Sequence, residues 1–160
     1  MVRGGAKPPS GAAPVPKVAG LAKPLHGNYI PQGLTAEQFD VLSSIVRSRV
    51  GDISDDIVVQ GSRVTGTAKP TSDIDIAIRV SRHQFESIVR ERFGSPNPGS
   101  AKERTMQHAL ATGKIQAGEA GLRGLRRELE RQLGMEVDIS IILRDGPFDN
   151  GSSIPLNIDS

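Results

Sequence analysis

The sequence contains no cysteine, and this absence excludes disulfide bonds, zinc sites built on thiolates and catalysis by a thiol nucleophile. Aromatic residues are scarce as well, because Phe, Tyr and Trp together make up 3% of the 160 residues and Trp is missing altogether. A hydrophobic core must therefore be built from Ile, Val, Leu and Ala. We also do not expect sequence-specific reading of single-stranded nucleic acid by aromatic stacking.

Long apolar segments are missing too. No run of about 18 apolar residues is present, so no transmembrane helix and no membrane insertion are expected. The N-terminus lacks the apolar stretch of a signal peptide, so an export signal, if there is one, lies elsewhere, for instance on a larger parent polypeptide. The formal net charge of +2 is compatible with a polyanionic partner but too small to require one.

Proline and glycine are concentrated at the start of the chain. Residues 1–33 contain six of the eleven prolines together with six glycines. Such a composition cannot offset its ordering entropy by burial, so this stretch is predicted to be a linker, without stable structure. A single domain is predicted to follow over residues 34–160, with order beginning at Thr35.

Capping residues and apolar spacing predict four helices in this domain. They span residues 35–50, 81–93, 100–112 and 119–133. The first and third open with predicted capping boxes, Thr35 with Gln38 and Ser100 with Glu103. Gly51 and Gly134 are natural stops for the first and last helix.

Three strands are predicted over residues 57–60, 73–80 and 135–143. The second alternates cleanly, with isoleucines and a valine on one face and Asp73, Asp75, Ala77 and Arg79 on the other. Residues 113–118 are ambiguous, and the chain after residue 144 is irregular. The order of elements predicts an α/β (α+β) domain with a small mixed sheet of about three to five strands flanked by helices.

Three aspartates interrupt the predicted strands: Asp73, Asp75 and Asp138. Residues i and i+2 of a strand lie about 6.5–7 Å apart on one face. Two carboxylates placed in this way can lean together and share one hard cation, and a third can complete a second site. Mg²⁺ prefers such oxygen ligands and usually completes its coordination with water and substrate phosphates. Two such ions can clamp the attacking and departing oxygens of a phosphoryl displacement.

Gly61 and Ser62, directly after the first predicted strand, supply a complementary group. Glycine lets a phosphate approach the main chain closely, and the serine hydroxyl can donate a hydrogen bond to a phosphate oxygen. Arg63 adds a cation beside them. Asp-x-Asp and Gly-Ser are each common alone, and Asp73 could merely cap a turn. Their combination with Asp138 in a later strand favours a site for metal and phosphate over that simpler interpretation.

The stretches QGSR, TSDIDIAI and MEVDISII resemble the nucleotidyltransferase superfamily typified by DNA polymerase β, over residues 57–143. The resemblance implies that Asp73 and Asp75 hold two Mg²⁺ ions, or Mn²⁺ in their place. It also implies that Asp138 completes the site of the ion that activates the acceptor hydroxyl, and that Gly61 and Ser62 hold the triphosphate. The implied reaction is in-line attack of an acceptor hydroxyl on the α-phosphorus of an NTP, which releases pyrophosphate.

Cations surround this core. Between residues 101 and 131 there are seven cations against four acids. Arg123, Arg127 and Arg131 are spaced four apart and would share a helix face, as a surface that follows RNA or NTP phosphates or as a solvated face with ion pairs. Lys114 could reach a phosphate from the segment between two helices. The three histidines have no partner at metal-binding spacing and are predicted to be ordinary residues, with His83 and His108 on helices and His26 in the linker.

The setting of the core refines the expected function. A catalytic core behind a Pro/Gly-rich leader is similar to the nucleotidyltransferase domains at the C-termini of bacterial polymorphic toxins. Such a domain would act in the cytoplasm of a recipient cell, on RNA such as tRNA, and an immunity protein would neutralise it. Two alternatives stay open: a minimal nucleotidyltransferase that modifies protein hydroxyls in a toxin–antitoxin pair, and a non-catalytic module that binds nucleotide and regulates a partner.

Overall fold

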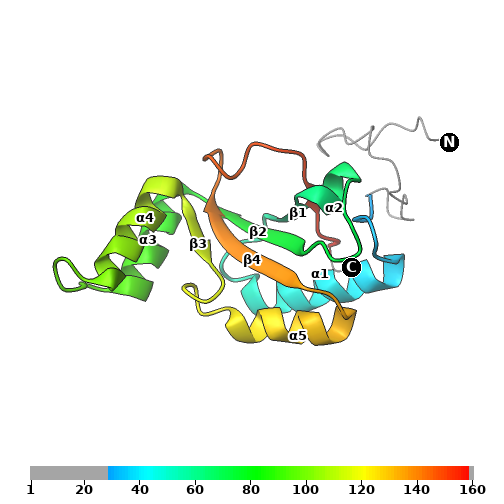
Figure 1. The fold of residues 1–160 in the computed structure, drawn as a ribbon, viewed down its shortest axis with the longest axis horizontal. Coiled ribbons are helices and arrows are strands. Elements are labelled where there is room, and N and C mark those ends of the chain that lie inside the picture. Colours follow the sequence, from blue (N-terminus) through cyan, green and yellow to red (C-terminus); the bar gives the residue numbers. More distant parts are fainter. Residues whose placement is uncertain (1–28, 159–160) are drawn as a thin grey trace.

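Two strands with alternating apolar side chains form the centre of a five-stranded mixed sheet. The computed structural model describes residues 29–158 of the chain (Figure 1). β2 (Ile74–Val80) pairs in parallel with β4 (Val137–Leu143), and β1 (Ile57–Gln60) lies antiparallel on the other side of β2. The edge strands are β3 (Lys114–Gln116) and β5 (Ile154–Pro155), which gives the order β3-β4-β2-β1-β5. The fold class predicted from the sequence is confirmed.

Helices cover one face of this sheet and flank its ends (Figure 1). Those within residues 29–158 are α1 (Ala36–Val50), α2 (Ser62–Thr65), α3 (Arg82–Phe93), α4 (Ala101–Thr112) and α5 (Arg123–Leu133). α1 and α5 lie side by side under the sheet, and α3 and α4 pair beyond its β3 end (Figure 1). The apolar residues of β2 and β4 form a single core cluster with those of α1, α3 and α5. Within residues 29–158, the opposite face has only a small buried apolar cluster, made of Val58, Ala77 and Ile142.

Most predicted boundaries agree with the structure. The Thr35 capping box is present in both halves. The predicted capping box at Ser100 is only half formed. The Ser100 hydroxyl accepts from the main-chain N–H of Glu103, but the Glu103 carboxylate accepts from the N–H of Gly99 and not from that of Ser100. The reason is that the Ser100 N–H already donates to the carbonyl of Asn97.

The segment between α4 and α5 differs most from the prediction. The ambiguous residues form β3, which pairs antiparallel with β4. α5 begins at Arg123, and not at residue 119, because residues 117–122 form a turn. In that turn the carboxylate of Glu119 accepts from the N–H of Gln116, and Gly121 has a φ of +77°. A left-handed residue of this kind cannot continue a helix.

Packed structure starts earlier than the predicted Thr35. Ile30 and Leu34 are 4% and 8% exposed and belong to the core. The N–H of Gln32 donates to the carbonyl of Arg63, and its side-chain oxygen accepts from the N–H of Ala68. These bonds attach the end of the predicted linker to the loop around α2. Residues 1–28 of that linker lie outside the described residues.

The segment after β4, which looked irregular in the sequence, is fixed across the open face of the sheet. Arg79 of β2 bonds to Asp56 at 2.8 Å and to Asp149 at 3.1 Å, and Arg144 bonds to Asp56 at 2.9 Å. The segment then returns as β5, a strand that sequence analysis missed, beside β1. Burial alone would raise the pKa of Asp56, but hydrogen bonds and charge from Arg79 and Arg144 hold this pKa below its usual value.

None of the helices in residues 29–158 is long and apolar enough to cross a membrane, in agreement with the sequence.

The ion-pair network predicts a pH-dependent loss of stability on Asp56→Asn. The partly buried Arg79 and the exposed Arg144 lose their carboxylate partner, which should cost about 1–3 kcal/mol of unfolding free energy near pH 7. Because the pKa of Asp56 is lowered in the folded protein, its contribution exists above the unfolded pKa and disappears as the pH falls. Urea unfolding near pH 7 and about pH 3 should therefore show a difference from wild type that shrinks at acid pH. Asp52→Asn, at an exposed site, is the control, and an unchanged Asp56→Asn at pH 7 would contradict this account.

Candidate active site

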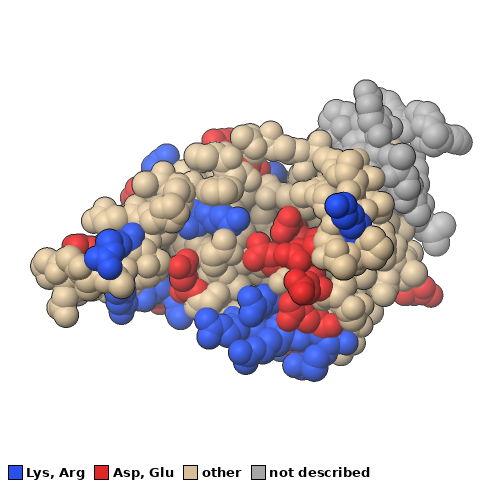
Figure 2. Space-filling model, viewed as in Figure 1, with Lys and Arg blue, Asp and Glu red and all other residues tan. Residues whose placement is uncertain are grey.

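The open face of the sheet brings two of the predicted acidic residues side by side. Asp75 of β2 is the register partner of Asp138 of β4, and on its other side Asp75 pairs with Gln60 of β1. Asp73 directly precedes β2 at the same end of the sheet. Figure 2 shows acidic side chains gathered over the starts of β2 and β4. Three residues from chain segments more than sixty residues apart thus form one acidic cluster.

The period of the strands produces this placement. Ile74 and Ile76 on either side of Asp75 are buried in the core, as are Val137 and Ile139 on either side of Asp138. Because alternate residues of a strand point to opposite faces, both aspartates must emerge on the face that the helices do not cover. Each is half-buried there, and Asp73 is exposed.

The acidic cluster perturbs its own protonation. Burial raises the pKa of Asp75, and the neighbouring charges of Asp138 and Asp73 raise it further, while the charge of Lys114 acts in the opposite direction. The charge of one lysine thus lowers the pKa of Asp75, whereas two carboxylates and the loss of hydration raise it. A site with this excess of negative charge is suited to binding a cation.

Gly61 brings the main chain of the Gly-Ser loop against this cluster. Its φ is +85°, a region that favours glycine. A Cβ at this position would lie 2.5 Å from Oδ2 of Asp75, so any larger residue would displace the carboxylate. Ser62 follows as the first residue of α2, and no group within residues 29–158 forms a hydrogen bond with its partly exposed hydroxyl. The loop therefore presents an accessible donor beside Asp75.

Arg63 has a different position from the one that sequence analysis suggested. Its side chain is buried, at 3% exposure, and its guanidinium donates to the carbonyl of Gln32 at 2.7 Å and to that of Ser72 at 2.7 and 3.2 Å. These bonds join the three segments that flank the Gly-Ser loop. Arg63 therefore supports the loop from behind, and the geometry does not favour its predicted contact with the nucleotide.

Asp73, Asp75 and Asp138 are the residues that could hold divalent cations. Their carboxylates are the hard oxygen ligands that Mg²⁺ prefers, and burial together with the like charges of Asp138 and Asp73 raises the pKa of Asp75. Within residues 29–158, no three His, Cys, Asp or Glu side chains already converge as ready-made ligands. The candidate ligand set therefore depends on the strand register and on the chemistry of the three carboxylates.

The predicted cations take up two different places. Lys114 of β3 is the register partner of Ile142, so it shares the open face with the acidic cluster, and its Nζ lies 4.6 Å from the ring centroid of Phe148. Arg123 and Arg127 are exposed on α5, which packs under the sheet. Figure 2 shows a band of cationic side chains along this helix, next to the acidic cluster.

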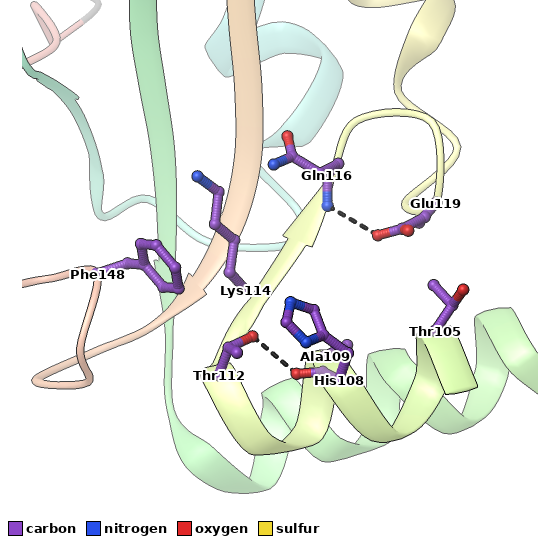
Figure 3. A pocket seen from close by; sticks show the side chains of 8 residues that line it. All are labelled: Thr105, His108, Ala109, Thr112, Lys114, Gln116, Glu119 and Phe148. Carbon is purple, nitrogen blue, oxygen red and sulfur yellow. Dashed lines mark hydrogen bonds between the residues drawn. The ribbon is translucent and has the colours of Figure 1, made fainter. Parts of the chain in front are cut away.

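Two pockets flank Phe148, a residue that sequence analysis did not single out. The first, of about 330 Å³, lies between α4 and β3 (Figure 3) and is lined by Thr105, His108, Ala109, Thr112, Lys114, Gln116, Glu119 and Phe148. The second, of about 240 Å³, lies beside the Gly-Ser loop and is lined by Gln60, Gly61, Thr65, Phe148, Asn150, Gly151 and Ser152. A lone Phe in an irregular segment gave no periodic signal, so only the fold shows its position.

The family model described as a nucleotidyltransferase domain matches residues 40–154, which is well over half of the chain. This range contains the Gly-Ser loop, all three aspartates and both pockets that flank Phe148. No curated protein and no solved structure shows a significant match to the chain.

The raised pKa of Asp75 predicts that Asp75→Asn stabilises the metal-free protein. A carboxyl whose folded pKa lies above its unfolded value favours folding when protonated, and this benefit is lost as the pH rises through the folded pKa. Asp75→Asn should therefore have the higher melting temperature near pH 7 in EDTA, and the gain should vanish near about pH 3. Asp52→Asn serves as the control. A lower melting temperature for Asp75→Asn under these conditions would contradict the electrostatic account.

The close approach at Gly61 predicts a second effect on stability. Gly61→Ala combines a left-handed φ with a contact to Asp75 and should cost about 1–3 kcal/mol of unfolding free energy. Gly124→Ala is a matched control in α5, where a Cβ would meet nothing within 4 Å and a helical alanine should be neutral or stabilising. Denaturant unfolding of both variants tests the pair. Equal unfolding free energies of the two variants would contradict the prediction, because they would show that the Gly-Ser loop accommodates a Cβ without cost.

Proposed function

The chain belongs to the nucleotidyltransferase domain family, and from this premise we propose that it is a Mg²⁺-dependent enzyme that transfers a nucleoside monophosphate from an NTP to a hydroxyl of RNA. The observation that carries the proposal is the register of β2 and β4. This register places Asp75 beside Asp138, and the Asp75 carboxylate also lies next to the main chain of Gly61. Transfer of a phosphoryl group requires that phosphate and cations be held together, and a loop whose main chain lies against neighbouring carboxylates can do so.

Each group has a role in this proposal. The N–H and hydroxyl groups of Gly61 and Ser62 bind the triphosphate, and Asp73, Asp75 and Asp138 hold the cations. Bound Mg²⁺ would neutralise phosphate charge and lower the pKa of the acceptor hydroxyl. An oxygen of Asp138 takes the proton of that hydroxyl, since β4 is the acidic strand farther from the Gly-Ser loop. The acceptor oxygen then bonds to the α-phosphorus, and the bond to the β-phosphate breaks as pyrophosphate leaves with its electron pair.

The choice of RNA as acceptor is supported by the band of cations on α5. Arg123, Arg127 and Arg131 are exposed and follow one another at spacings of four on the helix. A row of this kind can neutralise successive phosphates of a nucleic acid backbone. The same row of cations would contribute nothing to the binding of an uncharged acceptor.

The resemblance to the C-terminal domains of polymorphic toxins supports a further part of the proposal. In that setting the domain acts in the cytoplasm of a recipient cell, after delivery as part of a larger polypeptide. An immunity protein would then protect the producing cell by covering the active site. Co-expression of a neighbouring open reading frame that abolishes toxicity of the wild-type chain would support this setting.

Transfer should depend on all three aspartates. Incubation with Mg²⁺, each α-labelled NTP in turn, total RNA and lysate protein should label RNA. Asp73→Asn, Asp75→Asn and Asp138→Asn should each lower the rate by about 10²-fold or more, whereas Asp52→Asn should not. EDTA should stop the reaction, and Mg²⁺ or Mn²⁺ should restore it.

The outcomes separate the candidate functions. Label in protein in place of RNA would favour modification of protein hydroxyls. No transfer and no pyrophosphate release with any NTP would leave a module that only binds nucleotide. Wild-type rates in all three aspartate variants would refute the site itself.

A further inference from the structure

We propose that the pocket between α4 and β3 binds the terminal nucleoside of the RNA acceptor, with its 3′-hydroxyl directed at Asp138. This inference rests on the proposed function and names where the second substrate binds. It assigns a binding role to His108, Gln116 and Glu119, which no motif in the sequence indicated.

The position of the pocket follows from the order of the strands. The Gly-Ser loop ends β1, the acidic pair lies on β2 and β4, and β3 is the next strand beyond Asp138. In an in-line displacement the attacking oxygen enters opposite the leaving group. A triphosphate held at Gly61 and Ser62 therefore requires an acceptor that enters from the side of β3. The pocket lined by Lys114 and Gln116 of β3 opens on that side.

The lining of this pocket suits a nucleoside. In Figure 3 the imidazole of His108 rises from α4 into the space bounded by Lys114, Gln116 and Glu119. Within residues 29–158, the His108 ring and the Gln116 amide form no hydrogen bond, and the Glu119 carboxylate only accepts from the Gln116 main-chain N–H at 3.2 Å. Free donors and acceptors of both kinds at one surface can bind the edges of a base and the hydroxyls of a ribose.

Phe148 supplies an aromatic wall for the same pocket. Phe148 is 42% exposed although it lines a pocket, and the Lys114 Nζ is 4.6 Å from the centroid of its ring. The carbonyl of Phe148 accepts from the Gln60 side chain at 3.2 Å, and the adjacent Asp149 is paired with Arg79. The ring is therefore held on a fixed loop. An exposed ring and a cation together offer a stacking surface and a phosphate contact to a nucleotide.

The cations of α5 continue the path away from the pocket. The guanidinium of Arg123 lies against Gly118, in the turn that connects β3 to α5. Arg127 and Arg131 follow on the same helix. A strand that enters the pocket with its last nucleoside can thus place its preceding phosphates along this exposed row, which Figure 2 shows as a band of cations.

The proposed arrangement completes the transfer reaction. The 3′-oxygen of the bound nucleoside forms a bond to the α-phosphorus of the NTP, and its proton passes to Asp138. The bond between the α-phosphorus and the bridging oxygen breaks, and pyrophosphate leaves on the side of the Gly-Ser loop. The RNA is thereby extended by one nucleotide.

Kinetics of two pocket variants test the inference. His108→Ala and Gln116→Ala should each raise the KM for a short single-stranded RNA with a free 3′-hydroxyl by about tenfold, and leave the KM for the NTP unchanged. His83→Ala, at an exposed histidine of α3 outside the pocket, should leave both constants as in the wild type. Both pocket residues are exposed, so unchanged thermal unfolding should show that the variants are folded. RNA constants equal to those of the wild type in both variants would overturn the proposal.

Cross-linking provides a readout that does not require activity. A short RNA with 4-thiouridine as its 3′-terminal base should, after irradiation and peptide mapping, be attached to residues 105–119 or to Phe148. Attachment there without any transfer would refute the proposed reaction but support the pocket as an RNA site. Transfer to RNA with attachment only around residues 61–65 would support the proposed reaction and overturn this inference, as would transfer to protein alone.

Discussion

The parallel pairing of β2 with β4 is the constraint on which the rest of the site depends. It sets Ile76 against Ile139 in the core and, in the same register, Asp75 against Asp138 on the open face. A slip by one residue would turn a whole strand over and bury its carboxylates among the helices, at a large cost. The hydrophobic core therefore enforces the register, and the register places the carboxylates together. Stability and chemistry are coupled through one set of strand contacts.

The unequal covering of the sheet explains how a small domain tolerates this cluster. Helices α1, α3 and α5 contribute to the single large core, whereas the cluster on the other face consists, among the described residues, of three buried apolar side chains. The carboxylates lie on that second face, where they keep part of their hydration. Two arginines stabilise the segments around this face. Arg63 donates hydrogen bonds to the main chain on both sides of the Gly-Ser loop, and Arg79 forms ion pairs with Asp56 and with Asp149 of the segment after β4. Buried or paired arginines thus shape the site, while Lys114 acts against the negative charge around Asp75.

Phe148 divides the open face into two compartments. One adjoins the Gly-Ser loop and the other adjoins β3. In the proposed reaction the first would hold the NTP and the second the acceptor. Lys114 lies between Phe148 and the acidic cluster in its interactions. Its Nζ contacts the Phe148 ring, and its charge acts to lower the pKa of Asp75. The arrangement agrees with membership of the nucleotidyltransferase family and with a reaction that joins two phosphate-bearing molecules.

The sequence by itself determined the features that depend on local periodicity. Alternation of isoleucine with aspartate, the Thr35 capping box and the position of Gly61 and Ser62 are properties of a few consecutive residues, so the main strands, the helices and the acidic residues could be predicted. Tertiary structure alone decided the role of Arg63, the edge strand β3 and the position of Phe148. These depend on partners far along the chain, such as Gln32 for Arg63 and β4 for β3. A short strand or a single aromatic residue has no period of its own, so only the packing around it defines its place.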